Sequence, residues 1–375
     1  MKKLLFVHVK LVCGGAENAL FNLLNLLDKS KYDISVLVLN DGGEWEQKFR
    51  DAGIRVIHCY DRQRPRQRIR NYILRKRIDY ARNHFGKGLI PLATGKKYDL
   101  VIDYHTIAHF KRVCQGVSGK KIKYIHGDVE TNPTLRGFVD AIRGTLVEYD
   151  HIICVSKEAK GAFVRMMAME DKSGVCYNPI DSQQIITKAE EPVCDIPLQK
   201  YICAVGRLSE EKGFSRLISI HKNLIDQGLE HSLVIVGDGP LWDELQDQIR
   251  RLNCQGSVVM TGYRANPYGY MKNSLFTVCS SFTEGLPVIA MESLCLGVPL
   301  VSAYPSVGEL FGEECCGIIT ENDDGCLEEG IRKMLSDSEF YRRAKTGAEK
   351  CSHAFSSENM IKQVERIYDT VMEEI

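Results

Sequence analysis

Short apolar runs alternate with helical segments along the whole chain, and this alternation limits the possible folds more than any other feature. Apolar strands separated by helices indicate a parallel sheet built from strand–helix–strand units. The runs form two series, so we expect one α/β plan to occur twice. The predicted strands are residues 4–9, 34–39, 55–60, 100–104, 122–126 and 151–155, then 201–205, 233–236, 275–279, 298–302 and 317–320.

A polar segment at 177–197 separates the two series and is interpreted as the linker between two domains. A chain of 375 residues is long for one domain and suits two. We therefore expect an N-terminal domain at 1–178 and a C-terminal domain at 179–357. Residues 358–375 follow as a helix, with apolar side chains at helical spacing.

The two halves carry opposite charge although the chain as a whole is neutral. Residues 1–178 hold 31 Lys and Arg against 19 Asp and Glu, a net of +12, and the remainder holds 18 against 30, a net of −12. Such asymmetry suggests that only one half meets an anionic partner.

The densest basic segment, residues 62–77, interleaves arginines with apolar and aromatic side chains. This pattern is typical of attachment to an anionic membrane surface. A solvated basic face is the alternative, whereas nucleic acid is disfavoured because no recognisable nucleic-acid-binding module accompanies the segment. The arginines expected on the membrane or acceptor side are Arg66, Arg68, Arg70, Arg75 and Arg77.

The cysteine pattern and the hydropathy indicate a cytoplasmic protein, and the basic segment at 62–77 adds the expectation that it is peripheral on the inner face of the cytoplasmic membrane. Fourteen cysteines without C-x-x-C spacing favour reduced thiols over a disulfide framework or a zinc site. No apolar run approaches the roughly 18–20 residues that span a bilayer. The first apolar run is predicted to be a strand rather than a signal peptide, because His8 and Lys10 interrupt it.

Two glutamates follow the predicted strand at 275–279. Glu284 falls in the turn beyond this strand, and Glu292 on the predicted helix at 287–297. Ligands of open parallel sheets bind beyond the carboxyl ends of the strands. The helix's first amides, from Gly285 onward, suit phosphate, and a carboxylate suits sugar or ribose hydroxyls. Alternatively, Glu284 is an acid at a helix start and Glu292 a solvated helix residue.

A pair of cations lies at a second strand-to-helix turn. Arg207 follows the predicted strand at 201–205, and Lys212 stands five residues later, just before the next helix. Two fixed cations at such a turn could neutralise a diphosphate, the arginine through its donor fork and the lysine as a point charge. Salt bridges to the neighbouring Glu210 and Glu211 are the alternative.

The N-terminal half offers two weaker signals. Gly14 and Gly15 lie between the first strand and its helix, where the absence of a Cβ lets a phosphate or sugar approach the backbone. A tight turn that needs glycine is the alternative. His126 ends the predicted strand at 122–126 and so lies at its ligand-facing rim, although a single histidine is usually structural.

Taken together, these motifs resemble family 4 of the retaining glycosyltransferases, of the type found in bacterial polysaccharide biosynthesis. They occur in the family's order across almost the whole chain, and Arg207/Lys212 with the E-x7-E pair Glu284/Glu292 is the most specific combination. Two segments depart from the pattern, namely 305–309 in place of a Gly-Gly-x-Pro-Glu run and 177–179 at the hinge. The remaining matches are the segments 14–17, 126–128, 236–240 and 262–263.

The resemblance implies the GT-B fold, which is two Rossmann-like domains facing a central cleft. The N-terminal domain would bind the acceptor, the C-terminal domain would bind a nucleotide-sugar, and the last helix would cross back onto the N-terminal domain. The implied donor-binding residues are Gly14, Gly15, Arg207, Lys212, Gly285 and Leu286 for the diphosphate, Glu292 for the ribose and Tyr263 for the base. Glu284 would contact the transferred sugar, and His126 would line the reaction centre.

The implied reaction is retaining transfer of a hexose or N-acetylhexosamine from a UDP-sugar to a glycan or lipid-linked saccharide, with no cofactor. No DxD-type motif stands in a plausible loop, so no essential metal is expected, and Asp323 with Asp324 is predicted to cap a helix. A GT-B sugar-nucleotide epimerase or another nucleotide-sugar-binding protein is the alternative. An NAD-linked oxidoreductase is disfavoured because neither glycine pair completes G-x-G-x-x-G.

Overall fold

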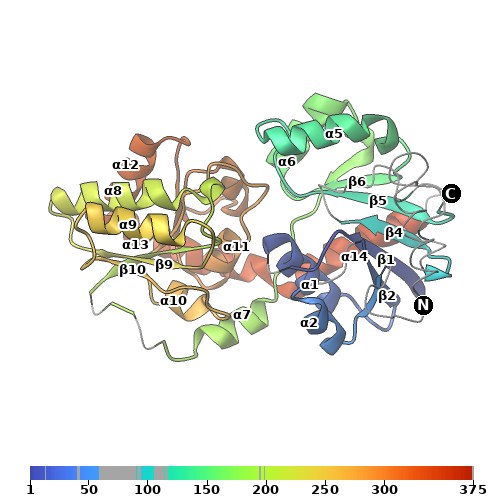
Figure 1. Ribbon diagram of the computed structural model, residues 1–375, viewed down its shortest axis with the longest axis horizontal. Helices are drawn as coiled ribbons and strands as arrows, with labels where there is room; N and C mark the ends of the chain where they lie inside the picture. The colour runs from blue at the N-terminus through green and yellow to red at the C-terminus, as the bar shows by residue number, and fades with distance from the viewer. Residues whose placement is uncertain are drawn as a thin grey trace. The chain divides into compact units, whose positions relative to one another are not determined.

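The computed structural model describes residues 1–12, 14–39, 43–58, 90, 94–104, 114, 117–193, 196–197 and 199–373 (Figure 1). The chain divides into two compact units. The N-terminal unit comprises Met1–Pro179 with Met360–Ile375, and the C-terminal unit comprises Ile180–Asn359. These limits lie beside the expected borders at 178/179 and 357/358.

The N-terminal unit contains a parallel sheet of seven described strands in the order β3-β2-β1-β4-β5-β6-β7. Strand β1 pairs with both β2 and β4, so the order reverses between β1 and β4. Strand β7 was not predicted, because it has only three residues, two of them serine and glycine. The strands are β1 (Lys2–His8), β2 (Tyr32–Val38), β3 (Arg55–His58), β4 (Leu100–Asp103), β5 (Lys120–Ile125), β6 (His151–Cys154) and β7 (Ser173–Val175).

Helices cover both faces of this sheet (Figure 1). On one face, α5 (Pro133–Leu146) and α6 (Lys157–Met167) bury an apolar side against the strands. Asn132 starts α5 by accepting hydrogen bonds from two backbone amides, and Ser156 starts α6 by accepting one from the Ala159 amide. The other face carries α1 (Gly15–Leu26) and α14 (Ser357–Glu373), and the remaining helices among the described residues of this unit are α2 (Glu46–Asp51) and the 3-10 turn η3 (Glu170–Lys172).

Polar contacts fasten α14 to the N-terminal unit. Asp369 accepts a hydrogen bond from Tyr32 Oη at 2.8 Å and pairs with Lys2 at 3.1 Å. The hydroxyls of Tyr124 and Tyr368 lie 2.9 Å apart in the core. The final helix therefore belongs to the N-terminal unit from Met360 onward, although it follows the C-terminal unit in the chain.

An ion pair is buried in the same unit. Lys123 Nζ on β5 lies 2.9 Å from Asp103 Oδ2 on β4, and the two side chains are 0% and 4% exposed. Tyr149 Oη donates to the same carboxylate oxygen at 2.8 Å. Because both charges are removed from water, the loss of either side chain would leave the other as an unpaired buried charge.

The C-terminal unit contains a second parallel sheet, with six described strands in the order β10-β9-β8-β11-β12-β13. Strand β8 pairs with both β9 and β11, so the order reverses between β8 and β11. The strands are β8 (Tyr201–Val205), β9 (Ser232–Val236), β10 (Val258–Met260), β11 (Thr277–Cys279), β12 (Leu300–Ser302) and β13 (Gly317–Ile319).

Two apolar cores lie on opposite faces of the second sheet. The larger one joins α8 (Phe214–Asp226), α9 (Trp242–Arg251), α12 (Asp324–Ser336) and α13 (Ser338–Cys351) to the strands, and the smaller one includes α10 (Tyr268–Lys272) and α11 (Val288–Cys295). Asp323 caps α12 by accepting from the Cys326 amide at 2.9 Å, as predicted. The 3-10 turns are η4 (Glu210–Lys212), η5 (Pro305–Leu310) and η6 (Ser352–Phe355).

The interpretation of 177–197 as a linker is wrong for its central part. Residues Ser182–Ala189 form helix α7, which Asp181 caps by accepting from the Gln184 amide. Ile185 and Ala189 are buried and lie four residues apart, on one side of the helix. They face α10 and α11, so this helix is part of the C-terminal unit.

The helix that carries Glu292 is shorter than predicted. It spans Val288–Cys295, and Pro287 precedes it with an extended backbone (ψ 116°). Gly285 and Leu286 therefore lie in the turn before the helix and do not provide its first amides. The physical reason is proline, which disfavours helical geometry in the residue before it.

Candidate functional site

The candidate donor site of the C-terminal unit lies where the strand order reverses. The loop after β8 carries Arg207 and Lys212, and the loop after β11 carries Glu284. Because β8 and β11 are neighbours in the sheet, their two carboxyl-end loops lie side by side. Such a reversal point is where ligands bind in open α/β sheets.

Lys212 and Glu284 form the central contact of these loops. Lys212 Nζ lies 2.5 Å from Glu284 Oε1, and Ser281 Oγ donates to the same oxygen at 2.7 Å. Burial lowers the pKa of Lys212, but the Glu284 carboxylate outweighs this effect, so the pKa lies above its ordinary value. Lys212 is therefore held as a fixed cation, and it pairs with Glu284 rather than with the adjacent glutamates.

Backbone contacts hold the two loops together. The Phe282 amide donates to the Glu211 carbonyl at 2.8 Å, and Ser280 Oγ donates to the Lys212 carbonyl at 2.9 Å. Gly213 has a left-handed backbone (φ 65°), and a Cβ there would come within 2.1 Å of the Ser280 carbonyl oxygen. The loops can approach this closely only because residue 213 is glycine.

Arg207 lies on the exposed side of the same turn. Within the described part of the chain, its guanidinium has no ion-pair partner. Gly285 and Leu286 are buried in the turn after Glu284. An exposed cation, a fixed cation and a buried turn thus lie on two neighbouring loops.

Glu292 is buried and is not the solvated helix residue of the alternative interpretation. Its side chain on α11 accepts a hydrogen bond from Tyr268 Oη on α10 at 3.1 Å, and the residue is 7% exposed. Burial raises the pKa of Glu292 to about 7, although the bond from Tyr268 lowers it in part. This carboxyl group therefore changes charge near neutral pH.

The loop expected to contact the base follows β10. Gly262 forms an isolated bridge with Gly237, which ties this loop to the end of β9. Tyr263 comes next and is 58% exposed, an unusual position for a large aromatic side chain. An exposed ring on an anchored loop is suited to contact with a flat ligand.

In the N-terminal unit, Gly14 and Gly15 form the start of α1. Gly14 is the N-cap residue, and Gly15 is the first residue of the helix. A Cβ at Gly15 would meet no atom within 4 Å, so the chain's own packing does not require glycine there. The tight-turn alternative is thus unsupported at Gly15. Nearby, burial raises the pKa of Glu17, whose Oε1 lies 3.9 Å from His8 Nε2.

His126 immediately follows β5 and is half-buried. Its Nε2 lies 2.5 Å from the carbonyl oxygen of Tyr104, which can only accept, so Nε2 carries the proton. The centre of its ring also lies 4.5 Å from the centre of the Tyr104 ring and 5.5 Å from that of the Tyr124 ring. The ring orientation is therefore fixed.

Comparison with known proteins matches both halves of the chain. Residues 13–184 match the family described as Glycosyltransferase Family 4, and residues 195–351 match Glycosyl transferases group 1. A Campylobacter jejuni protein is 27% identical over 95% of this chain and 96% of its own length. It is named N-acetylgalactosamine-N,N'-diacetylbacillosaminyl-diphospho-undecaprenol 4-alpha-N-acetylgalactosaminyltransferase. The amylovoran biosynthesis glycosyltransferase AmsD of Erwinia amylovora is 24% identical over 77% of each chain.

The chain belongs to the family 4 glycosyltransferases. Solved structures agree with this assignment at the level of the fold. Anabaena Alr3699/HepE in complex with UDP has a TM-score of 0.75 at 18% identity, covering 99% of this chain and all of that one. A mutant of S. aureus TarM has a TM-score of 0.78 at 11% identity, with full coverage of both chains. The expected GT-B fold, with two Rossmann-like sheets, is confirmed.

Three contacts of this glycosyltransferase were not predicted. Tyr268 holds Glu292, while Arg216 on α8 and Asn322 before α12 bind the backbone that leads to Glu284. Arg216 lies between Ser215 and Leu217 in a helix, and Tyr268 lies in a short segment with a second tyrosine, so neither stands out in the sequence. Their partners are 24 to 106 residues away.

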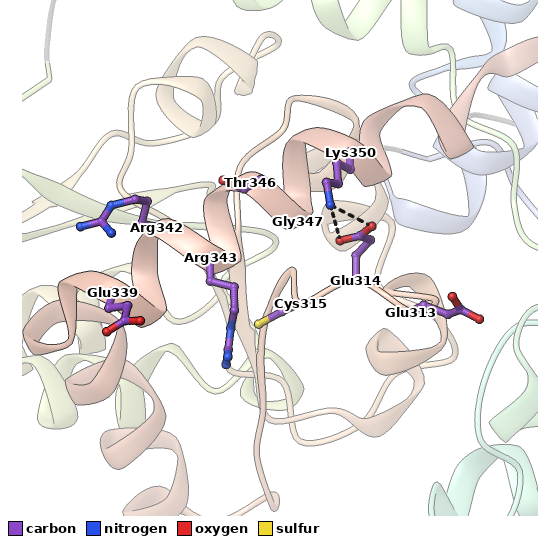
Figure 2. A pocket seen from close by; sticks show the side chains of 9 residues that line it. All are labelled: Glu313, Glu314, Cys315, Glu339, Arg342, Arg343, Thr346, Gly347 and Lys350. Carbon is purple, nitrogen blue, oxygen red and sulfur yellow. Dashed lines mark hydrogen bonds and ion pairs between the residues drawn. The ribbon is translucent and has the colours of Figure 1, made fainter.

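The C-terminal unit of the glycosyltransferase also has a cavity that no residue of the donor loops lines. This cavity of about 570 Å³ lies beside α13, where Figure 2 shows Lys350 reaching Glu314. Its acidic and basic side chains balance, so it lacks the positive excess that a nucleotide would need. The lining residues are Glu313, Glu314, Cys315, Glu339, Arg342, Arg343, Thr346, Gly347 and Lys350.

The predicted membrane segment at 62–77, with all five of its named arginines, lies outside the described residues. Among the residues that are described, no helix combines the length and the apolar character needed to cross a membrane. The same residues contain no group of three or more His, Cys, Asp and Glu side chains placed to hold a metal ion.

Proposed function

We propose that the chain is a retaining glycosyltransferase that transfers a hexose or N-acetylhexosamine from a UDP-sugar to a glycan or lipid-linked saccharide. The observation that carries the proposal is the Lys212–Glu284 contact at the reversal point of the C-terminal sheet. It brings one residue of each family motif together, with Arg207 exposed on the same turn. This combination supports a diphosphate and a sugar bound next to each other.

The donor diphosphate would be bound by Arg207, Lys212 and the amides of Gly285 and Leu286. Departure of the nucleoside diphosphate builds negative charge on its phosphate oxygens. Cations that are already fixed stabilise this charge without reorganising, and the pairing of Lys212 supports that role. Gly14 and Gly15 are assigned to the same donor, where a missing side chain admits the phosphates.

Glu284 would stabilise the positive charge that develops on the sugar ring. Glu292 would accept hydrogen bonds from the ribose hydroxyls, and Tyr263 would contact the base. For retention, the acceptor hydroxyl would attack from the leaving-group side and pass its proton to the departing phosphate. His126 would line this reaction centre, and its fixed ring supports a positioning role.

The choice of donor and acceptor is supported by the relatives. Two structures with this fold are named as complexes with UDP and with UDP-glucose. The C. jejuni relative is named for a diphospho-undecaprenol-linked saccharide and for N-acetylgalactosamine. A lipid-linked acceptor would confine the reaction to a membrane surface, which fits the basic N-terminal half.

A screen of nucleotide-sugars for release of free UDP tests the proposal. We expect release with a UDP-hexose or UDP-N-acetylhexosamine, stimulated by a lipid-linked saccharide and unchanged by EDTA. Conversion of the donor to an epimer without any acceptor would favour the alternative sugar-nucleotide epimerase. Inversion at the anomeric carbon of the product, read by NMR coupling constants, would refute retention.

Donor affinity is expected to rise with pH because of Glu292. With its pKa raised to about 7, the carboxyl group is mostly protonated at pH 6 and mostly ionised at pH 8. Only the ionised form accepts two ribose hydroxyls, so affinity for UDP-N-acetylgalactosamine should rise about tenfold over this range. Calorimetric titration at pH 6 and pH 8 measures this affinity. The phosphates of this donor do not titrate between these pH values.

The matched control for this prediction is Glu292→Gln, which keeps the shape of the side chain but cannot ionise. Its affinity should be weaker at pH 8 and constant with pH, and its main kinetic effect should be a higher apparent donor KM. A pH dependence that survives the substitution would assign the titration to another group.

Attachment to anionic membranes is the remaining part of the proposal. The arginines of 62–77 should bind anionic vesicles but not neutral ones, and salt should weaken binding as the Debye length falls from about 10 Å at 0.1 M to about 3 Å at 1 M. Replacing Arg66, Arg68, Arg70, Arg75 and Arg77 with serine should release the protein in co-sedimentation. The same five changes to lysine keep the charge and should preserve binding. Equal binding to both vesicle types, or to neither, would contradict the proposal.

A further inference from the structure

Arg216 is a buried cation directly behind the loop that carries Glu284. It lies on α8 and is 6% exposed. Its Nε and Nη2 donate to the Ser280 carbonyl at 2.8 and 2.5 Å, and Nη2 also donates to the Ser281 carbonyl at 3.1 Å. The guanidinium therefore binds two consecutive carbonyls of the residues that immediately follow β11.

The same guanidinium contacts the loop at two further points. Its carbon lies 4.0 Å from the centre of the Phe282 ring, a side chain that is 51% exposed. Nη2 also donates to Asn322 Oδ1 at 2.8 Å, and Asn322 Nδ2 in turn donates to the Phe282 carbonyl at 2.9 Å. Arg216 and Asn322 thus bind three successive carbonyls, those of residues 280, 281 and 282.

Holding this cation in the protein interior is costly. Burial lowers the pKa of Arg216, and its only ion pair among the described residues, with Asp324 at 3.6 Å, is long and involves an exposed carboxylate. A buried charge is retained where its hydrogen bonds are needed. Here they go to the backbone that sets the position of Glu284, two residues beyond Phe282.

We propose that Arg216 is a positioning residue for the transfer reaction, fixing the 280–286 loop so that Glu284 and the Gly285–Leu286 amides meet the donor. The inference rests on the proposed function of that loop. Arginine is required because its planar fork reaches several carbonyls at once, whereas a lysine offers one nitrogen. Arg216 itself does not touch the substrate.

The experiment compares Arg216→Lys with Lys222→Gln, a control on the same helix whose partner is the exposed Asp226. Release of UDP from UDP-N-acetylgalactosamine gives kcat and KM, hydrogen exchange reports the peptide that covers 280–286, and a melt gives Tm. We expect Arg216→Lys to lower kcat about tenfold, since small displacements of catalytic groups are costly. Exchange should speed up in the 280–286 peptide. The control should change neither.

A double-mutant cycle separates positioning from general stability. In a Glu284→Gln background the effect of Arg216→Lys on kcat should shrink to less than about threefold, because the group it positions is already impaired. In a Glu292→Gln background the full effect should remain. Equal losses in both backgrounds, or a lower Tm with unchanged kcat, would overturn the inference.

Failure of the proposed function would look different. If the wild type released UDP from no nucleotide-sugar, the proposed donor would be wrong. Hydrogen exchange in the 280–286 peptide would still test the contacts of Arg216. Unchanged exchange in that peptide after Arg216→Lys would reject the positioning role, whatever the substrate.

Discussion

Replacing Lys212 with alanine is expected to lower donor turnover by about 10²–10³, as the loss of one preorganised charge-stabilising group does in other enzymes. The substitution removes the cation nearest to Glu284, at 2.5 Å, and leaves that carboxylate unpaired beside the incoming diphosphate. Repulsion then adds to the loss of attraction. The rate of UDP release from the donor found in the screen measures the effect.

Arg207→Ala should lower donor turnover by a factor of the same order, without leaving a carboxylate unpaired. Arg207 is exposed, so its removal disturbs no described ion pair and should leave the two loops in place. Lys200→Ala, an exposed lysine just before β8, is the matched control and should turn over donor at the wild-type rate. Wild-type rates in both the Arg207 and Lys212 variants would show that this turn does not bind the diphosphate.

Lys123→Met should destabilise the N-terminal unit by about 3–5 kcal/mol, the usual cost of removing one partner of a buried ion pair. Asp103 would be left as an unpaired carboxylate whose one remaining hydrogen bond among the described residues comes from Tyr149. Hydrogen exchange of peptides from β4 and β5 gives the free energy of unfolding for this unit. That measurement is preferable to one melting curve because a chain of two units need not unfold in one step.

Two further variants test whether burial of the Lys123–Asp103 pair explains this loss of stability. Lys120 lies on the same strand as Lys123, and Lys120→Met breaks its pair with Asp150. Those two side chains are 31% and 28% exposed, so the change should be at most about 1 kcal/mol. The double variant Lys123→Met/Asp103→Asn removes both charges and keeps an acceptor for Tyr149, so it should recover much of the loss. Equal costs for Lys120 and Lys123 would show that burial does not govern the pair.

Local sequence patterns were sufficient to predict most of the elements. Apolar runs located most of the strands, helical spacing located α14, and Asp323 was recognised as a cap. These features depend on neighbours within a few residues, which the sequence displays directly. The family motifs then identified the loops after β8 and β11 as the candidate donor site.

Tertiary packing decided the elements that local pattern left ambiguous. Helix α7 was interpreted as linker because most of its residues are polar. Its apolar Ile185 and Ala189 form a buried side only because α10 and α11 cover them. The start of α11, by contrast, is a local effect that the prediction overlooked, because Pro287 disfavours helical geometry in the residue before it and so keeps Gly285 and Leu286 outside the helix.

The sequence by itself determined two α/β units and the residue types available at each strand end. Only the tertiary structure decided which of those residues meet. Lys212 contacts Glu284, 72 positions away, because β8 and β11 are neighbours in the sheet. Arg216 and Lys123 have no distinctive local pattern, since a buried cation is recognised only by the partners that surround it. Strand order sets those partners, and it depends on how whole strands and helices pack rather than on any short stretch of sequence.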